Sequence, residues 1–389
     1  MKKMKEYLNE QFVTTFQKEP EKYFSCGGRF EVLGNHTDHN HGLCIAATCD
    51  LEIGAAVIKR EDKTIRLLSE GFGYFEMDIS SLEMIEDEMG KPAALVRGIL
   101  NYLSNEFKVG GFDIYVKCEI PAGTGVSSSA AFEMLIATII DNLFNNSEIP
   151  MMTMCKAGQF AERNYYGKKC GLLDQIGVSA GGLVFIDFAD ISNPFVDTLH
   201  PNLEGYQFMI LNTGGSHAEL SAMYDAIPQD MYAVSDYFKK AFLRDVNYEE
   251  LFHNKMDIIE KCGELAYNRA EHFFKENERV QKAIEAINAN DIKTLIKLMN
   301  ESRESSTKLL QNMYVDKKKD SPLEACELIM KVSGKKAGVK INGGGFAGSV
   351  IALIPEDVLD AVVKAAKEKY GKENIYLVNV RDEKPSEII

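Results

Sequence analysis

The chain has 389 residues, of which 45% are apolar and 26% are charged, and its formal net charge is −14. This length exceeds one typical hydrophobic core, so two domains are expected. The acidic balance disfavours nucleic acid and anionic membranes as partners, whereas a phosphate-bearing small molecule needs only a local positive potential.

The first ten residues are basic, but no long apolar stretch follows them as in a secretory signal. No segment approaches the run of about 18 apolar residues that spans a membrane. Eight cysteines are scattered without a C-x-x-C pair, which favours free thiols over a zinc or redox site. We therefore expect a cytoplasmic protein that binds neither membranes nor nucleic acid.

The first half of the chain predicts helices mixed with strands. The pattern indicates a short amphipathic helix over 6–20, further helices over 93–107 and 153–166, and a buried helix over 130–144. Strands are expected over 24–33, 43–57, 64–78, 112–120 and 183–188, with a polar loop at 34–42. A break at 167–171 separates the helix over 153–166 from a segment that opens at Leu172.

The second half is helix-rich from residue 217 to residue 314. It then predicts strands over 338–341, 349–354 and 374–380, a glycine-rich turn at 342–348 and a helix over 357–370. The polar tail 381–389 is expected to be frayed. Turn signals near 190–205 predict domains of residues 1–195 and 196–389, and the fold class is mixed α+β.

A loop at 121–131 carries two glycines and three serines between the predicted strand 112–120 and the predicted helix 130–144. Unpaired N–H groups and the positive dipole end of that helix would attract an anion such as a nucleotide phosphate. The loop lacks the Gly-Lys-Ser/Thr ending of a Walker A loop, and its hydroxyls are suited to magnesium. An ordinary capped helix is the alternative. The candidate phosphate-binding residues are Pro121, Gly123, Gly125, Ser127, Ser128 and Ser129.

A second block, at 27–42, places Arg29, three histidines and Asp38 directly after a short apolar strand. His36, Asp38, His39 and His41 are possible metal ligands, and a plain polar surface loop is a further alternative. Asp, Asn and His side chains also offer directional donors and acceptors to several neighbouring hydroxyls. We favour this last interpretation, a site for a sugar or polyol.

Two further features suit phosphoryl transfer. Glu162 and Asp174 form a carboxylate pair in which one group can hold Mg²⁺ while the other orients or deprotonates an attacking hydroxyl. The alternative is a pair of solvated surface carboxylates. Gly343, Gly344 and Gly345 belong to a run with four glycines in six residues, which favours a ligand-facing loop over a simple tight turn.

Taken in order, these blocks resemble the galactokinase family of the GHMP small-molecule kinases. Residues 28–40, GRFEVLGNHTDHN, are similar to the signature G-R-x-N-x-I-G-E-H-x-D-Y-x, and residues 121–131 are similar to P-x-x-x-G-L-S-S-S-A-A. Residues 170–175, CGLLDQ, match C-G-x-M-D-Q, and residues 342–348 are similar to G-G-G-F-G-G. The resemblance covers residues 24–354, and four blocks in this order are strongly specific.

The resemblance implies an enzyme with an N-terminal ribosomal-protein-S5-domain-2-like domain and a ferredoxin-like C-terminal domain, with ATP and sugar between them. It implies that Asp174 is the catalytic base and Arg29 its partner, that Ser129 and Glu162 are magnesium ligands, and that 123–128 cradles the ATP phosphates. It assigns sugar contacts to Asn35, His36, Asp38, Gly171 and Tyr224. The arginines that usually follow this tyrosine are absent.

The expected reaction is ATP-dependent phosphorylation of the C1 hydroxyl of a hexose, with galactose as the first choice. Two departures leave the sugar open: Asn35 replaces the Glu of G-E-H, which normally accepts a hydrogen bond from the C6 hydroxyl, and His39 replaces the Tyr. The neutral Asn35 can still accept such a bond, or the site favours a hexuronate such as galacturonate.

Two other functions are weighed against a sugar kinase. A non-catalytic sensor that binds ATP and sugar is disfavoured by the intact serine loop. A kinase of another alcohol, such as mevalonate, is disfavoured by the His36-Thr-Asp38 block. The expected ligands are ATP, Mg²⁺ and a small-molecule sugar, and the expected state is a monomer or weak homodimer.

Overall fold

In the first sheet, burial alternates along the strand Thr64–Ser69, as expected of a half-buried strand, whereas the central strands Lys22–Leu33 and Leu43–Lys59 are buried along most of their length. This computed structural model describes residues 2–121, 123–214, 220–315 and 321–389. The sheet has eight strands in the order β12-β1-β2-β5-β3-β4, and β6 and β7 extend it from β2. Their bounds are β1 Lys22–Leu33, β2 Leu43–Lys59, β3 Thr64–Ser69, β4 Gly73–Asp78, β5 Phe112–Cys118, β6 Leu183–Asp187, β7 Phe195–Leu199 and β12 Ser386–Glu387.

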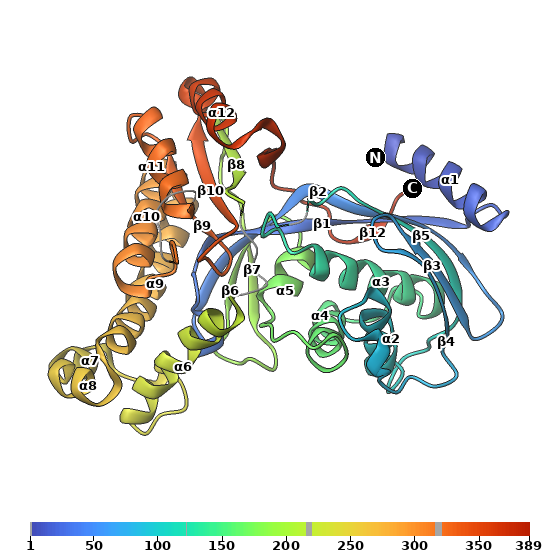
Figure 1. Ribbon diagram of the computed structural model, residues 1–389, viewed down its shortest axis with the longest axis horizontal. Coiled ribbons are helices and arrows are strands. Elements are labelled where there is room, and N and C mark those ends of the chain that lie inside the picture. The colour runs from blue at the N-terminus through green and yellow to red at the C-terminus, as the bar shows by residue number, and fades with distance from the viewer. Residues whose placement is uncertain (1, 122, 215–219, 316–320) are drawn as a thin grey trace.

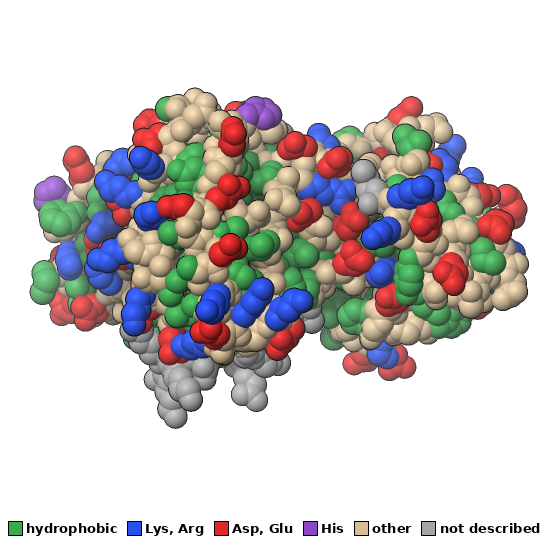
Figure 2. All heavy atoms as spheres, turned by 90° about the horizontal axis from the view of Figure 1, so that it is seen from above, with side chains coloured by type: hydrophobic (Ala, Val, Ile, Leu, Met, Phe, Trp, Pro, Cys, Tyr) green, Lys and Arg blue, Asp and Glu red, His purple; other side chains and the backbone are tan. Residues whose placement is uncertain are grey.

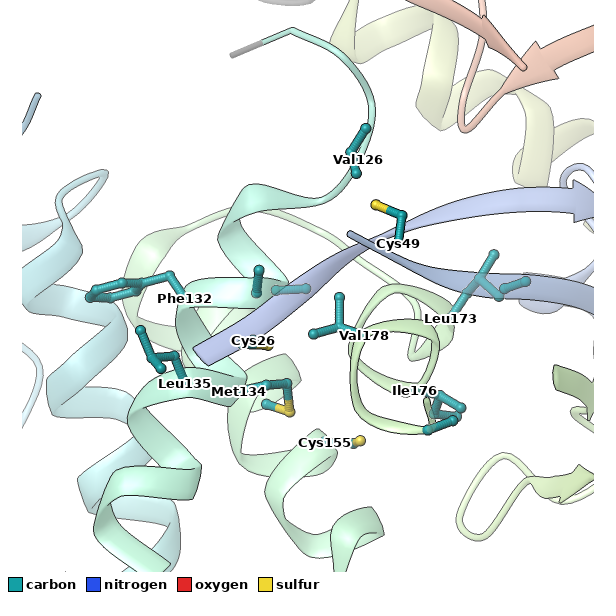
Figure 3. Close-up of a cluster of buried hydrophobic side chains, with 14 of the residues drawn as sticks. Cys26, Cys49, Val126, Phe132, Met134, Leu135, Cys155, Leu173, Ile176 and Val178 are labelled. Atoms are coloured by element: carbon teal, nitrogen blue, oxygen red, sulfur yellow. The ribbon is translucent and has the colours of Figure 1, made fainter. Parts of the chain in front are cut away.

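Helices cover both faces of this sheet (Figure 1). One face is packed by α2 (Pro92–Leu103), α3 (Ser128–Phe144), α4 (Met151–Ala161) and α5 (Leu173–Ser179), and the other by α1 (Lys2–Phe16). Figure 3 shows part of the core, where Met134 of α3, Cys155 of α4 and Val178 of α5 gather with Cys26 of β1. The apolar sequence of α3 is explained by its burial among these neighbours.

The second sheet is antiparallel, in the order β11-β8-β10-β9. Its strands are β8 (Tyr206–Asn212), β9 (Gly338–Asn342), β10 (Ser349–Pro355) and β11 (Ile375–Val378), and it packs with α10 (Ile292–Ser305), α11 (Pro322–Val332) and α12 (Glu356–Tyr370). The remaining helices are α6 (Ser221–Tyr237), α7 (Tyr248–His253), α8 (Lys255–Cys262) and α9 (Glu264–Asn288). Helix α9 contacts β1 and β2, and so links this half to the first sheet.

Seen from above, the molecule narrows between two masses, and acidic and basic side chains are interspersed over that face (Figure 2). Within the described residues, no helix combines the length and apolar character needed to cross a membrane. The mixed α+β class predicted from the sequence is confirmed. Strand β7 pairs with β6, so the first sheet continues to residue 199.

The expectation of a frayed tail is wrong. Arg381 is only 8% exposed, and its guanidinium donates to Glu52 Oε2 and to Ser25 Oγ, each at 2.7 Å. Farther along, β12 pairs with β1, and the Ile388 N–H donates to the Tyr23 carbonyl at 2.7 Å. The tail is polar because it closes the edge of the first sheet through ion pairs and backbone hydrogen bonds rather than through a core.

The predicted helix over 153–166 is present, but its last part is π-helical instead of α-helical. Helix α4 begins at Met151 and ends at Ala161, and a π-helical turn continues it over Glu162–Tyr166. Gly167 then adopts a φ of +90°, which favours glycine and ends the helix. The wider turn begins at Glu162, one of the candidate site residues.

Candidate active site

The structure brings most of the sequence-predicted residues to one pocket of about 610 Å³. Those on its wall are Arg29, Asn35, His36, Asp38, Gly171, Asp174, Tyr224, Gly343 and Gly344. They come from β1, from the loop after it, from the start of α5, from α6 and from the loop between β9 and β10. Segments more than 300 residues apart in the chain therefore share one cavity, as the hydrogen bond from Asn35 Nδ2 to the Gly343 carbonyl shows.

Asp174 is held from two sides. Arg29 donates to its Oδ1 through Nε at 2.9 Å and Nη2 at 2.6 Å, and Ser127 donates to its Oδ2 at 2.6 Å. Burial acts to raise the pKa of Asp174, but the charge of Arg29 and these hydrogen bonds outweigh it and hold the pKa below its ordinary value. The carboxylate is therefore oriented and ionised at neutral pH.

The glycine- and serine-rich loop packs directly on β1. A Cβ at Gly28 would lie 2.5 Å from Val126 Cγ1, so glycine is required for this close approach. The Arg29 N–H donates to the Val126 carbonyl at 3.1 Å, and Arg29 Nη1 donates to the Gly125 carbonyl at 2.6 Å. Arg29 thus fixes the loop and Asp174 together.

The N-terminus of α3 is open. Ser127 stands at the cap position with a φ of +56°, and its hydroxyl bonds Asp174 instead of capping the helix. The first N–H groups of α3 have no intrahelical partner, and the helix dipole makes this end positive. Gly123 and Ser128 are exposed beside it. This arrangement suits a phosphate group, whereas Ala122 of the same block lies outside the described residues.

Glu162 and Ser129 lie together at the base of this loop. Ser129 Oγ is 3.1 Å from Glu162 Oε1, and Lys168 Nζ is 2.6 Å from the same oxygen. Glu162 is 1% exposed, while the Lys168 side chain is 54% exposed. Behind them, Gln175 Nε2 donates to Glu133 Oε2 at 2.9 Å and to Glu162 Oε2 at 3.3 Å. Burial and the charge of Glu162 raise the pKa of Glu133 well above its ordinary value.

Asp38 approaches the backbone of Gly171 too closely for any side chain there. A Cβ at Gly171 would lie 2.3 Å from Asp38 Oδ2. Burial and, second, the charge of Glu31 raise the pKa of Asp38 to about 6. An acidic acceptor held in a polar pocket in this way is suited to bind hydroxyl groups of a ligand.

The glycine loop between β9 and β10 ties the site together through its carbonyl groups. Gly343 accepts from Asn35 Nδ2 at 2.7 Å, the Gly344 carbonyl bonds His36 Nε2 at 2.8 Å, and Gly345 accepts from the Tyr224 hydroxyl at 2.8 Å. A Cβ at Gly344 would lie 2.4 Å from the Tyr224 ring. Gly343 and Gly344 line the pocket, and the close packing explains why the loop is rich in glycine.

Two residues of the pocket region were missed from the sequence. Glu31 lines the pocket, and Lys340 Nζ donates to its Oε1 at 2.7 Å, with Lys340 fully buried. The signature itself carried the signal for Glu31: it has Asn four residues before its Glu, whereas this chain has Glu31 and then Asn35. Lys340 gave no such signal, because its partner is 309 residues away.

Helix α9 supports the loop after β1 from below. Glu276 Oε1 accepts from the Gly34 N–H at 3.1 Å and the Asn35 N–H at 3.4 Å, and His272 Nε2 lies 2.9 Å from the Asn35 carbonyl. Asn277 Oδ1 accepts from the Leu43 N–H at 2.7 Å. Buried polar groups are satisfied by these bonds, which hold the loop in one conformation.

The metal interpretation of the histidine-rich block finds no support in the structure. Across the described ranges, no group of three or more His, Cys, Asp or Glu side chains is placed to hold a metal ion. His39 Nδ1 bonds the Asn40 amide at 2.9 Å, and the His41 ring stacks on Phe242 with centroids 3.7 Å apart. These rings pack against protein groups, and both also border the pocket.

Comparisons with known proteins place three family models on the chain. Residues 10–59 match the galactokinase galactose-binding signature, residues 94–182 match the GHMP kinase N-terminal domain, and residues 283–372 match the GHMP kinase C-terminal domain. The first match contains Arg29, Asn35 and Asp38, and the second contains the serine loop and Asp174.

Relatives match along most of their length. The chain is 30% identical to a galactokinase of Glaesserella parasuis, and the match covers 89% of this chain and 88% of the relative. It is 29% identical to a galactokinase of Clostridium acetobutylicum, and that match covers 96% of this chain and 97% of the relative. The structure is similar to that of Lactococcus lactis galactokinase complexed with galactose, with a TM-score of 0.85 and 26% sequence identity. The superposition covers 98% of this chain and 99% of the other. Methanococcus jannaschii mevalonate kinase, at 15% identity and a TM-score of 0.66, shares the fold.

Proposed function

This chain belongs to the galactokinase family of the GHMP kinases, and from this membership we propose that it transfers the γ-phosphoryl group of ATP to the C1 hydroxyl of galactose. The observation that carries the proposal is Asp174, held by Arg29 and Ser127 in the pocket where the sequence blocks meet. The products are galactose 1-phosphate and ADP.

In the proposed reaction, the C1 hydroxyl oxygen forms a bond to the γ-phosphorus while the bond from that phosphorus to the β,γ-bridging oxygen breaks. The hydroxyl proton passes to the Asp174 carboxylate, and the bridging oxygen leaves with ADP. Arg29 and Ser127 make Asp174 a weak base by stabilising its charged form. A weak base suits a loose transition state in which the proton leaves late.

The other residues position the reactants. We propose that the loop from Gly123 to Ser128 and the N-terminus of α3 bind the ATP phosphates. His36, Asp38 and the backbone at Gly171 are proposed to bind the sugar together with Tyr224, which lines the same pocket. Such positioning supplies much of the rate enhancement of phosphoryl transfer, because the protein contributes little covalent chemistry.

Magnesium is part of the proposal, because Ser129 and Glu162 fit a divalent cation. They offer a hydroxyl and a carboxylate oxygen 3.1 Å apart, the oxygen ligands that Mg²⁺ prefers. The ammonium group of Lys168 already lies against the same carboxylate oxygen, which shows that this position attracts positive charge. When bound, magnesium would neutralise charge on the phosphate groups.

The relatives favour a catalytic galactokinase over a galacturonate kinase or a sensor. We also propose that residues 1–195 and 196–389 are the two domains of the enzyme, meeting at the pocket. A cytoplasmic location is proposed on the ground that all eight cysteines are free. A monomer or weak homodimer is the proposed state.

The test is an ADP-release assay with galactose, galacturonate, arabinose, N-acetylgalactosamine and mevalonate as acceptors. We expect the highest kcat/KM with galactose, and a ³¹P spectrum of the product that shows coupling to the anomeric proton. Sugar binding without ADP release, or a product phosphorylated at another position, would contradict the proposal.

A further inference from the structure

Glu31 stands on the pocket wall two residues after Arg29 on the same strand. Alternate residues of a strand point to the same face, so both side chains face the pocket, while the intervening Phe30 packs against Phe208 with ring centroids 4.7 Å apart. Two residues along a strand span about 6.5 Å. This spacing is close to the length of a pyranose ring, so a sugar with its C1 hydroxyl at Asp174 beside Arg29 could reach Glu31 with its opposite end.

The two oxygens of Glu31 differ in their protein contacts. Oε1 accepts from Lys340 Nζ at 2.7 Å and from Asn35 Nδ2 at 3.2 Å. For Oε2, the hydrogen bond found within the described residues is a 3.5 Å contact with Asn35 Nδ2. A carboxylate oxygen has two acceptor positions, so Oε2 retains capacity for a donor from the pocket.

The side chain of Asn35 already makes hydrogen bonds to other groups of the protein. Its Oδ1 accepts from Asn312 Nδ2 at 2.9 Å, and its Nδ2 donates to Gly343 at 2.7 Å as well as to Glu31. Asn35 is fully buried. The amide therefore bridges Glu31, Asn312 and the glycine loop: both hydrogens of Nδ2 are engaged, and one acceptor position of Oδ1 is left beside the bond from Asn312.

Lys340 makes a carboxylate at position 31 tolerable. Its ammonium is fully buried and donates to Glu31 Oε1 and to the Ile341 carbonyl at 2.8 Å, so the pair has no net charge. A hydroxyl ligand can donate a hydrogen bond to Glu31, whereas an ionised carboxylate ligand has no proton to donate to Glu31 or to an ionised Asp38. These acceptors therefore favour a hexose over a hexuronate.

We propose that Glu31, and not Asn35, is the residue that selects the sugar, by accepting a hydrogen bond from the hydroxyl at the end of the ring remote from C1, the C6 hydroxyl of galactose. The inference rests on the proposed galactose kinase activity. Relative to the family signature, the chain has exchanged Asn and Glu between positions 31 and 35, so one of these two positions still carries a carboxylate.

The experiment compares galactose with 6-deoxygalactose (D-fucose) as acceptors, because the second sugar lacks only the C6 hydroxyl. Wild-type enzyme is expected to prefer galactose in kcat/KM. In Glu31→Gln, kcat/KM for galactose should fall about 10- to 100-fold, the effect of losing a hydrogen bond to a charged group. The kcat/KM for 6-deoxygalactose should change much less, so the ratio of kcat/KM for galactose to that for 6-deoxygalactose should fall.

Asn35→Ala is the second variant, and it still tests the assignment if Glu31→Gln does not fold. It should raise KM for both sugars together and preserve their ratio, because Asn35 only holds the wall of the pocket. Glu52→Gln is the matched control. Glu52 lies on the neighbouring strand β2, outside the pocket, and the substitution removes its carboxylate from the ion pair with Arg381. The ratio of kcat/KM between the two sugars should be the same in Glu52→Gln as in the wild type.

A ratio that survives in Glu31→Gln, or collapses in Asn35→Ala, overturns the assignment of Glu31. An inactive wild-type enzyme would instead contradict the galactose kinase activity itself, so the two failures are distinguishable. Folding of each variant is checked by circular dichroism, and its nucleotide site by binding of a fluorescent ATP analogue.

Discussion

The hydroxyl of Ser127 donates a 2.6 Å hydrogen bond to Oδ2 of Asp174, although 47 residues separate the two in the chain. One residue of the proposed phosphate-binding loop is thereby joined to the proposed base. Ser127 holds this position with a φ of +56°, a conformation that a non-glycine residue adopts at a cost of about 1–3 kcal/mol. The contact links the nucleotide side of the site to its acceptor side.

Ser127→Ala should move the acidic limb of the kcat–pH profile to higher pH. The proposed base Asp174 would act in its ionised form, and its pKa lies below the ordinary value partly because of the Ser127 hydroxyl. Without that donor the pKa rises, so activity is lost earlier as the pH falls. The profile is measured from pH 3 to pH 8, because the wild-type limb lies below the ordinary value of 3.8, and an unmoved acidic limb would exclude this role of Ser127.

Asp174→Asn should reduce kcat by several orders of magnitude while leaving ATP binding nearly intact. The amide keeps the size of the carboxylate but cannot take up the hydroxyl proton. Single-turnover rates and titration with a fluorescent ATP analogue separate the two effects. The control is Asp360→Asn on the exposed surface of α12, which should match the wild type. An unchanged rate in Asp174→Asn would end the assignment of the base.

Asp38 should make sugar binding sensitive to pH near 6. Its folded pKa of about 6 exceeds the ordinary value of 3.8, so below pH 6 the carboxyl group is protonated and loses acceptor capacity. KM for galactose should therefore rise as the pH falls through 6. A KM that stays constant between pH 7.5 and pH 5 would contradict a sugar contact by Asp38.

The same shift predicts a gain in stability for Asp38→Asn. A raised folded pKa means that ionised Asp38 disfavours the folded state above pH 6, and that this cost disappears as the pH falls toward 3.8. The variant should unfold at a higher temperature than wild type at pH 8, and the difference should shrink toward pH 5. Its affinity for galactose should nonetheless be lost.

Lys168→Met should strengthen binding of a divalent cation in the absence of nucleotide. The lysine ammonium lies 2.6 Å from Glu162 Oε1, the oxygen that Ser129 also contacts, so a cation must compete with it. Binding of Mn²⁺ by electron paramagnetic resonance should become several-fold tighter. Lys169→Met is the control, because that lysine pairs with the exposed Asp225 instead. Equal affinities in the two variants would argue against a cation site at Glu162.

Glu276→Ala should destabilise the fold by about 3–5 kcal/mol, because it leaves Arg279 buried without its partner and removes the acceptor for the Gly34 N–H. Glu278→Ala, on the exposed side of the same helix, should change the free energy of unfolding by less than about 0.5 kcal/mol. Urea unfolding measures both values. Similar losses in the two variants would contradict the role of Glu276 as a support.

Burial acts to raise the pKa of Glu276, but Arg279 and His272 outweigh it and lower the pKa to about 2. The stabilisation is therefore present above the ordinary value of 4.5 and lost as the pH falls toward 2. The difference between wild type and Glu276→Ala should accordingly shrink in acid.

The elements and blocks whose signals are local could be predicted from the residues alone. Alternating residues predicted the strand at β5, a continuous apolar run predicted α3, and the loop between them predicted an anion site at the start of α3. Four blocks in order identified the family, because each block combines glycines required for close approach with groups of defined chemistry. Backbone periodicity and motif order are properties of neighbouring residues, so they can be read without the fold.

Features that depend on partners far away in the chain became visible in the folded molecule. The tail after residue 380 is ordered because Arg381 meets Glu52 and Ser25, which lie 329 and 356 residues away. Asn35 has the residue type of a sugar contact, yet its amide bonds Asn312 and Gly343, and the carboxylate oxygen with only a 3.5 Å contact among the described residues belongs to Glu31. A side chain binds a ligand only with the capacity that its protein partners leave, and those partners are set by the packing of the two sheets.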